Sequence, residues 1–505
     1  MHTEVDNSKE TKLAGFLDHV TAQFSELRVL SGSEIGGEWK VATFPWSGKP
    51  LAILTPKTTE IVAPILSLAS EWGLPVHPVS RGRNWGLGSR LPSSDALILD
   101  LSSLDRILEL DMVNGTVRIE PGVTFQSLQQ RLKMEGLSYH LPAFGGPVDA
   151  SVLANALERG EGIGAYGDRF ALLWDFDVAL STGERLRTGH VRNGPTEISR
   201  LHARPAGPLI EGLFSQSNFG VVLAATLSLQ PTLPYATAIM SEIREDDGLD
   251  EVVPVLRRLI TSGLIAPQSL VLWDSAKQAS SLVGRYADDA EALLAKPKQW
   301  GASLLAFAPH PDLMRLTREI IHAELAPVSR SVHMQDDRDE AGHRQETIMT
   351  GFSDGNNVMS GYWGKKHRPQ RPGNMDTDRC GFVWLCPVIP FDAQAIYGLD
   401  KILTEESQSE NLFAALGMQA ISSRALHCFV SLAWDRDDPA AEEEALRAHA
   451  NISKRLMAQG FSPYRLGLLD LDLAPEPSET WAAVKRRLKN ALDPRGILSP
   501  GRIGE

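Results

Sequence analysis

The sequence predicts an α+β protein made of two domains, and three observations support this prediction. The chain has 505 residues, which is more than one ordinary domain contains. Residues 51–231 show short apolar runs separated by turn residues, a pattern typical of strands, hairpins and short helices. Residues 235–463 carry longer helical patterns mixed with strands, so we expect a separate cap or substrate domain there.

The elements expected in the first domain follow from apolar spacing and turn residues. Apolar residues at helical spacing predict one helix, and short apolar or alternating runs predict the strands. Paired runs around Asn114-Gly115 and Thr182-Gly183 predict two hairpins. In order, we expect a strand at 51–55, a helix at 57–72, strands at 73–79 and 96–101, hairpins at 107–123 and 174–188, and a strand at 221–229.

The second half is predicted to have longer helices. Apolar periodicity favours helices at 312–325, 440–460 and 479–492, and apolar runs favour strands at 382–389 and 427–434. Asp493-Pro494 is expected to end the last helix, because proline cannot continue it.

The composition is that of a globular protein without a general affinity for polyanions. Hydrophobic residues make up 43% of the chain and charged residues 22%. The 63 acidic residues outnumber the 50 basic ones, and the net charge of -13 argues against nucleic acid or membrane partners. The N-terminal segment MHTEVDNSKETK lacks a signal-peptide core, and no apolar run is as long as a membrane span, so we expect a cytoplasmic protein. The three cysteines have no metal-ligand spacing, so we expect neither a disulfide nor a metal site.

The segment PVSRGRNWGLG, residues 78–88, is a candidate diphosphate site. Its glycines allow tight backbone turns whose N–H groups can converge on an anion, and Arg81 and Arg83 add positive charge. A strand is expected on either side and no helix follows, which disfavours a P-loop or a Rossmann motif. An ordinary glycine-rich connection between strands is the alternative.

Two further glycine-rich segments follow in the same domain. Residues 145–167 read GGPVDASVLANALERGEGIGAYG, and residues 212–220 read GLFSQSNFG. Taken singly, these glycines are explained as loop punctuation. Their number within one region favours a cofactor site.

Taken together, these segments resemble the flavoprotein family of vanillyl-alcohol oxidase and p-cresol methylhydroxylase, from about Leu51 to Gly504. IEPGV at 119–123, NALERG at 155–160, AYGD at 165–168, Tyr464-Arg465 and LDPRGILSPGR at 492–502 match in order with the segments above. The resemblance implies a two-domain FAD-binding fold of the p-cresol methylhydroxylase type, with a mixed α/β cap. The FAD-binding domain would comprise residues 1–234 and 463–505, and the cap residues 235–462.

The resemblance also implies which residues hold FAD and which face the substrate. Tyr464 and Arg465 match a pair that binds the substrate's phenolate, and Arg424 and His427 match a strand that borders the pocket. His427 could act as an acid or base, or could be structural. Asp168 and Asp470 have the same two interpretations. The implied FAD-binding residues are Ser80, Arg81, Gly82, Arg83, Asn84, Trp85, Gly86, Pro121, Gly145, Gly146, Asn155, Gly160, Gly162, Tyr166, Gly167, Asp168, Gly220, Val222 and Arg502.

The chain departs from the family pattern at several positions. Leu87 stands where phenol-oxidising members have a tyrosine, and no acid precedes Asp149 where they offer a carboxylate. Phe382 falls at or near the position of the residue that bonds covalently to the flavin, and Arg83-Asn84-Trp85 replaces a second attachment motif. We therefore expect noncovalent FAD. The exception would be a covalent bond from Cys380 to the flavin. A buried cysteine, however, usually behaves as a small apolar residue.

The predicted function is that of an FAD-dependent oxidase or dehydrogenase. It would transfer hydride to the flavin from a small alcohol, an amine or an activated C–H group, phenolic and benzylic compounds included. Oxygen or another acceptor would reoxidise the flavin, and a homodimer is one option for the assembly. The alternative is a flavin-binding protein with a redirected non-redox or ligand-binding role, suggested by the missing phenolate and tethering residues.

Overall fold

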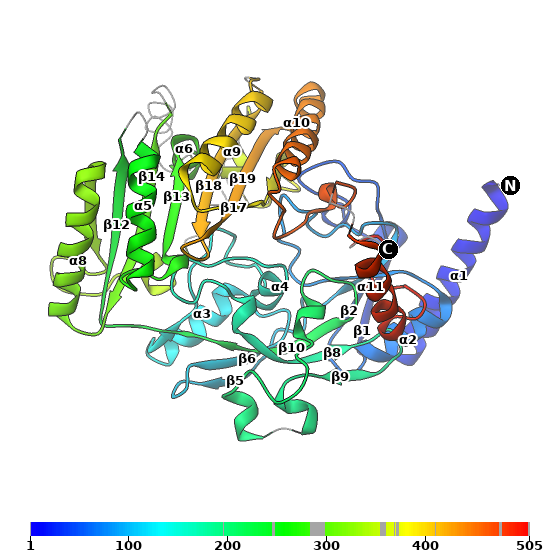
Figure 1. Ribbon diagram of the computed structural model, residues 1–505. Helices are drawn as coiled ribbons and strands as arrows, with labels where there is room; N and C mark the ends of the chain where they lie inside the picture. Colours follow the sequence, from blue (N-terminus) through cyan, green and yellow to red (C-terminus); the bar gives the residue numbers. More distant parts are fainter. Residues whose placement is uncertain are drawn as a thin grey trace.

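The computed structural model describes residues 2–194, 196–244, 248–282, 298–353, 360–367, 369, 373–409, 411–473 and 477–502. Figure 1 shows the chain in two parts. Residues up to about 231 and the C-terminal segment form the lower part. The strands from β12 onward form a sheet above this part, and helices lie beside that sheet.

The lower part contains two sheets with helices packed on them. Helices α1 and α2 share a core with the first sheet, and α3 and α4 share one with the second. Two short strands, β7 (Tyr139–His140) and β11 (Gln230–Pro231), pair separately. The first sheet runs β1 (Leu27–Ser31), β2 (Pro50–Pro56), β4 (Ala96–Asp100), β3 (Val76–Val79), and the second runs β5 (Ile107–Asp111), β6 (Thr116–Ile119), β10 (Val221–Ser228), β8 (Leu173–Ala179), β9 (Arg185–Arg187). The helices are α1 (His2–Gln23), α2 (Val62–Trp72), α3 (Phe125–Met134) and α4 (Val152–Leu157).

Helix α2 begins five residues later than the sequence predicts. The expected helix covered residues 57–72, whereas α2 is Val62–Trp72. Pro64 explains the difference, because proline has no N–H to donate and is tolerated only in the first turn of a helix. A start at residue 57 would place Pro64 in the helix interior.

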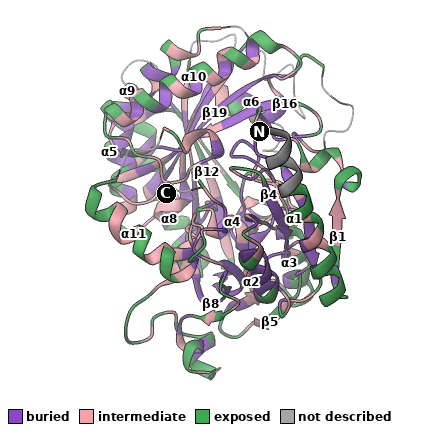
Figure 2. Ribbon diagram, turned by 90° about the vertical axis from the view of Figure 1, so that its right-hand side faces the viewer, coloured by how far each residue is buried: buried purple, intermediate pink, exposed green. Residues whose placement is uncertain are grey.

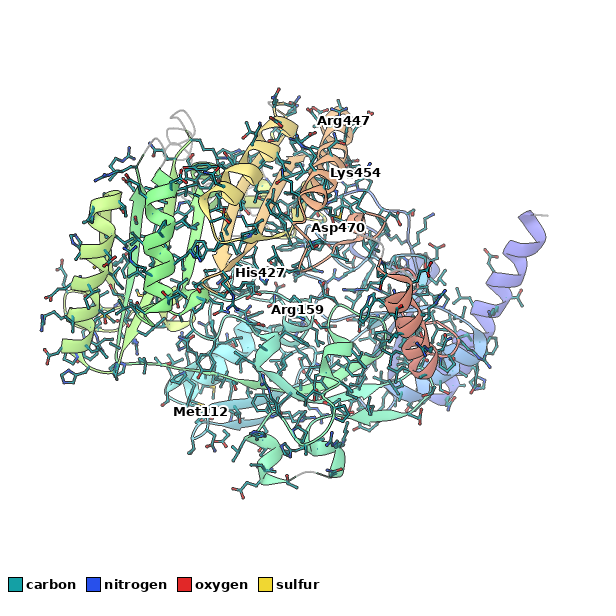
Figure 3. The ribbon with its side chains drawn as sticks, viewed as in Figure 1. Met112, Arg159, His427, Arg447, Lys454 and Asp470 are labelled. Atoms are coloured by element: carbon teal, nitrogen blue, oxygen red, sulfur yellow. The ribbon has the colours of Figure 1, made fainter. Side chains whose placement is uncertain are left out.

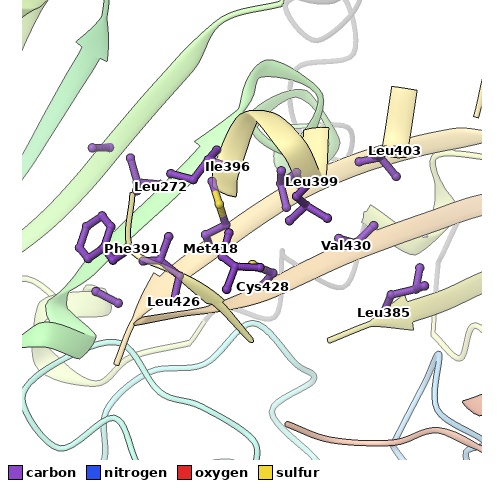
Figure 4. Packing of buried hydrophobic residues seen from close by; sticks show 14 of the residues in the cluster. Leu272, Leu385, Phe391, Ile396, Leu399, Leu403, Met418, Leu426, Cys428 and Val430 are labelled. Carbon is purple, nitrogen blue, oxygen red and sulfur yellow. The ribbon is translucent and has the colours of Figure 1, made fainter. Parts of the chain in front are cut away.

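The upper part is built on one long antiparallel sheet. Helices α5, α8, α9 and α10 cover one face of it, and their apolar side chains form a continuous core with the strands (Figures 1 and 4). The strand order is β15 (Ser329–Asp336), β12 (Tyr235–Ile243), β14 (Trp300–Ala308), β13 (Leu270–Asp274), β18 (Phe413–Ala420), β19 (Ala425–Asp435), β16 (Cys380–Leu385), with β17 (Val388–Pro390) also on β19. The helices are α5 (Gly248–Thr261), α6 (Ser275–Leu282), α8 (Pro311–Leu325), α9 (Ala393–Glu406) and α10 (Pro439–Ala458).

The register of β18 and β19 separates the two faces of this sheet. The pairs Leu416–Val430 and Met418–Cys428 belong to the helix-covered core. Because side chains alternate along a strand, the intervening pairs Gly417–Phe429 and Gln419–His427 lie on the opposite face. We call this second surface the inner face of the cap sheet.

The end of the chain returns to the first sheet. After α11 (Glu479–Leu492), the backbone of residues 497–499 runs beside β3. The Val76 N–H donates to Ile497 O at 2.8 Å, and the Ser499 N–H donates to Val76 O at 2.8 Å. Figure 2 shows that the strands of both parts are mostly buried, while the outer sides of the helices are exposed. The lower part is therefore assembled from segments far apart in the sequence.

The structure also gives the state of the cysteines and the character of the helices. Cys380, Cys386 and Cys428 are all buried and free. Among the helices that the structure describes, none is both long and apolar enough to cross a membrane.

Candidate active site

The loop after β3 presents a row of backbone donors. Gly82, Gly86 and Gly88 have φ values of +60°, +78° and +126°, which only glycine adopts readily. The N–H groups of residues 81–85 have no acceptor among the described residues, whereas the next one, of Gly86, donates to Thr43 Oγ1. Successive free N–H groups in such a turn form an anion-binding concavity. The loop therefore fits the diphosphate of a dinucleotide.

The two arginines of this loop are used differently. Arg81 Nε donates to Gly122 O at 2.9 Å, which ties the loop to the segment after β6. Arg83 pairs with the half-exposed Asp149, its Nε lying 2.9 Å from Asp149 Oδ2. Asp149, the first acidic residue after the segment at 141–147, thus compensates the charge of Arg83.

Trp85 and Gly86 join the loop to the cap. Trp85 Nε1 donates to Asp376 Oδ2 at 3.1 Å, and Ser89 Oγ donates to Asp376 Oδ1 at 2.8 Å. Burial raises the pKa of Asp376 to about 6. A methyl group on Gly86 would lie 2.6 Å from Trp384 Cδ1, so only glycine fits there. The Trp85 side chain is therefore an anchor to the cap.

A buried arginine organises the second glycine-rich segment. The Arg169 guanidinium donates to Asn155 Oδ1 at 3.0 Å and to Pro142 O at 2.7 Å. Its burial lowers the pKa of the guanidinium to about 10. A Cβ at Gly162 would lie 2.6 Å from Arg169 Nη2, so this glycine permits the close approach. From the cap, Gln419 Nε2 donates to Gly162 O at 2.7 Å.

The other predicted FAD-binding residues are placed mainly by backbone geometry. Gly160 and Gly167 are glycines because a Cβ would lie 2.2 Å from Asn155 Nδ2 and 2.3 Å from Gly162 O, respectively. Asp168 Oδ1 accepts the Ala171 N–H at 3.0 Å, which is a turn role. Pro121 O accepts a hydrogen bond from Ser151 Oγ, and the Tyr166 N–H donates to Gln230 Oε1. Gly145 and Gly146 follow Phe144, and Val222 is buried in β10, which begins just after Gly220. Arg502 forms a salt bridge with Glu158.

Tyr464, His427 and Glu161 form the centre of the site. The rings of Tyr464 and His427 are stacked, with centroids 3.8 Å apart and planes 2° apart. His427 Nδ1 lies 3.1 Å from Glu161 Oε1, and both side chains are largely buried. In Figure 3, His427 lies at the lower end of the cap sheet, where it meets the lower part. Three segments far apart in sequence thus meet at one point.

Arg465 extends this cluster to the diphosphate loop. Its Nη2 donates to Asn84 Oδ1 at 3.0 Å. The buried atoms Arg465 Nε, Tyr464 Oη and Glu161 Oε2 have no hydrogen-bond partner among the described residues. Buried polar groups are rarely left unpaired, so these atoms fit a site whose partners are ligand atoms.

A pocket lies where the diphosphate loop, the residues that follow Tyr464-Arg465 and the C-terminal segment meet. Its lining includes Asn84, Leu87, Leu466, Gln216 and Arg502. Leu87 is buried there, at the position where the resemblance implies a tyrosine in phenol-oxidising members. The lining combines apolar side chains with a few polar groups, as in most small-molecule sites.

Three candidates named from the sequence do not join this cluster. Arg424 is exposed in the turn before β19, where its backbone O accepts the Phe391 N–H. Asp470 lies 3.0 Å from His449 Nε2 and accepts the Gly467 N–H at 2.7 Å, which is a structural role. Cys380 is packed against Trp85 and Phe382, and burial raises the pKa of its thiol to far above the ordinary value. None of these contacts supports a catalytic role.

Sequence reasoning missed several residues that the structure brings to the site. Glu161 contacts His427, which is 266 residues away in the sequence. Gln419 donates to Gly162 of the second glycine-rich segment, 257 residues away. Asp376 anchors Trp85 across 291 residues. A lone acid or amide carries no signal of such long-range contacts.

Comparison with known proteins agrees with this geometry. Residues 50–189 match the FAD binding domain family. The chain is 32% identical over 501 residues to 1'-carboxy-chondrochloren decarboxylase of Chondromyces crocatus, covering 92% of each chain. It is 24% identical over 485 residues to the flavoprotein subunit of the hydroxylating 4-cresol dehydrogenase of Pseudomonas putida, covering 90% of this chain and 88% of the relative.

Solved structures share the fold over nearly the whole length. The 4-ethylphenol oxidase of Gulosibacter chungangensis superposes with a TM-score of 0.85 at 22% identity, covering 99% of this chain and 97% of the other. Substrate-bound p-cresol methylhydroxylase gives 0.85 at 21% identity, with 98% and 97% covered.

The fold, the anion-binding loop and these similarities define an FAD-binding oxidoreductase with a two-part architecture of p-cresol methylhydroxylase type. The predicted fold class and enzyme class are thereby confirmed. The chain belongs to the vanillyl-alcohol oxidase and p-cresol methylhydroxylase family of FAD oxidoreductases.

Proposed function

We propose that residues 1–234 and 463–505 hold FAD without a covalent bond, and that residues 235–462 cover it. Phe382 supports the noncovalent attachment, because its buried ring has no nucleophilic atom and packs against Trp85. The free N–H groups of residues 81–85 would bind the diphosphate. When bound, FAD supplies a hydride acceptor for a carbon of the substrate.

The neighbouring Tyr464 hydroxyl and Arg465 guanidinium, each with a buried atom that no described residue hydrogen-bonds well, are the observation that carries the proposed oxidation. Burial raises the pKa of Tyr464 well above its ordinary value, so its hydroxyl keeps a proton to donate. Arg465 adds a permanent positive charge. Together they would hold a substrate oxygen and stabilise negative charge that develops during oxidation. A small phenol, alcohol or amine, or a compound with an activated C–H bond, fits this chemistry.

An oxidation coupled to loss of CO2 is the second candidate. The relative that shares 32% identity over 92% of both chains is named as a decarboxylase of a carboxylated compound. Leu87 supports this candidate, because an apolar side chain cannot hydrogen-bond a phenolate. On this proposal the substrate carries a carboxylate beside the carbon that is oxidised.

The electron acceptor and the compartment are part of the same proposal. Oxygen or another acceptor would reoxidise the flavin, and a homodimer remains one option for the assembly. Three buried free cysteines are compatible with a reducing, cytoplasmic location.

Anaerobic mixing with candidate substrates tests the oxidation. Purified holoprotein would be mixed with 4-alkylphenols, benzylic alcohols and aryl-substituted carboxylic acids while the flavin absorbance is followed. We expect bleaching by at least one class, and CO2 release that matches flavin reduction if the second candidate holds. A flavin that stays oxidised with all of these compounds, although dithionite reduces it, would contradict the proposal.

A further inference from the structure

Lys277 places an ammonium group beside the inner face of the cap sheet. Lys277 lies in α6, directly after β13, where its own N–H donates to Asp274 Oδ1 at 2.7 Å. A methyl group on Gly417 would lie 3.5 Å from Lys277 Cε and 3.7 Å from Phe429. The Lys277 Nζ lies over the Trp384 ring, 4.6 Å from its centroid. The absence of a side chain at Gly417 leaves room for the lysine.

This ammonium forms no salt bridge with any described residue, although the charge of the Asp274 carboxylate still favours its protonated form. Asp274 is the acid nearest in sequence, but its Oδ2 pairs with Lys298 Nζ at 3.0 Å. Its Oδ1 accepts the N–H groups of Lys277 and Leu416. The aromatic ring of Trp384 is therefore the close contact of the Lys277 ammonium in the described structure, and Asp274 acts on it only as a charge already paired with Lys298.

Lys277 and His427 lie beside the same face of the cap sheet. The pair Gly417–Phe429, beside Lys277, is separated from the pair Gln419–His427 by two residues along each strand. At the rise of a strand this is about 7 Å, the length of a small organic molecule. Strand β16 also lies against the diphosphate loop, because the backbone N–H of Trp384 donates to Gly86 O at 3.2 Å.

We propose that Lys277 binds a carboxylate group of the substrate, which would make this chain an oxidoreductase of aromatic or other apolar carboxylic acids. The inference rests on the proposed function, since it places the substrate between the cap sheet and the flavin. The single ammonium suits a carboxylate, and the half-buried Trp384 and Phe429 offer apolar surface for the remainder of the molecule.

The charge state of Lys277 is compatible with this role. Burial lowers the pKa of Lys277 to about 8. The side chain is therefore mostly protonated at pH 7, and a bound carboxylate would raise its pKa again. An unpaired, partly buried ammonium gains more from an anion than an exposed one does, because it gives up less hydration.

Calorimetric titration with a matched pair of ligands tests the proposal. The FAD-loaded protein would be titrated with 3-phenylpropionate and with 3-phenylpropanamide, which differ mainly in charge. We expect the wild type to bind the acid at least 10-fold more tightly, as for a charge-assisted hydrogen bond. Lys277→Met should lose this preference while keeping its FAD content, Lys277→Arg should keep part of it, and the exposed-site control Lys401→Met should match the wild type.

Two results would overturn the proposal. One is equal affinity of the wild type for acid and amide, including no binding of either at millimolar concentration. The other is a Lys277→Met protein, folded by circular dichroism, that keeps the full preference for the acid. Failure of the proposed function looks different, because the wild type would then keep the acid preference while no candidate substrate reduces the flavin.

Discussion

At the scale of single residues, the site is a line of contacts from Asn84 to Glu161. Arg465 donates to Asn84, Tyr464 directly precedes Arg465 in the chain and stacks on His427, and His427 contacts Glu161. Each member restricts the orientation of the next. Positioning of this kind lets one arginine contribute strongly to charge stabilisation.

Replacing Arg465 tests this arrangement. Arg465→Ala should slow anaerobic flavin reduction by roughly 10²–10³-fold, the cost of removing one preorganised electrostatic donor. Arg465→Lys should restore little, because an ammonium lacks the planar fork that also reaches Asn84. Stopped-flow absorbance measures the rate, and the FAD content should stay near the wild-type value. A wild-type rate in Arg465→Ala would remove this residue from the site.

At the scale of elements, the diphosphate loop and strand β16 fit together without space for a methyl group. Gly86→Ala would add strain of about 1–2 kcal/mol from its positive φ. It would also bring Cβ to 2.6 Å from Trp384. We expect a lower melting temperature and reduced FAD content, measured by thermal scanning and flavin absorbance.

Gly263→Ala is the matched control for this substitution. Gly263 has φ +77°, close to that of Gly86, and nothing within 4 Å of a built Cβ. It therefore reports the backbone strain alone. If both variants lose the same stability and both keep FAD, the contact between loop and cap is not important.

Asp376 predicts a pH dependence of the junction between loop and cap. Its pKa is raised from 3.8 to about 6, so the folded state binds this proton more tightly than the unfolded state. The resulting stability is present below pH 3.8 and is lost as the pH rises to about 6, by up to about 3 kcal/mol. Asp376→Asn cannot ionise, so the pH dependence of its melting temperature between pH 4.5 and 7 should be weaker than that of the wild type. Parallel curves for the two proteins would show that Asp376 is not the responsible group.

At the scale of the whole molecule, FAD should contribute to the stability of both parts. Because Phe382 cannot form a covalent link, acid precipitation should release FAD into the supernatant. Removing FAD should lower the melting temperature, and adding it back should restore the value, with a gain of about 2.7 kcal/mol at 100 times Kd. Flavin that stays with the precipitated chain would contradict this prediction.

The sequence predicted local features better than contacts between distant segments. Helix α11 has its predicted bounds, 479–492, because capping and periodicity are local signals. The strand predicted at 382–389 is interrupted between β16 and β17, where Cys386 and Pro387 instead accept hydrogen bonds from Tyr464 and Cys428. The contacts of Lys277 depend on how strands far apart in the chain align, which no local pattern encodes.

The return of the C-terminal segment to β3 has a consequence for how the protein is made. The side chains of His77 and Ser499 are 3.1 Å apart across 422 residues of sequence, and Arg502, three residues further on, lines the pocket. A ribosome must therefore synthesise the entire cap before the sheet that borders the cofactor site can be completed. The nascent chain exposes an incomplete edge at β3 during that time, and such late, long-range pairing is slow. Cofactor capture in the cell is therefore a late event in biogenesis, and FAD supply matters most when translation is nearly finished.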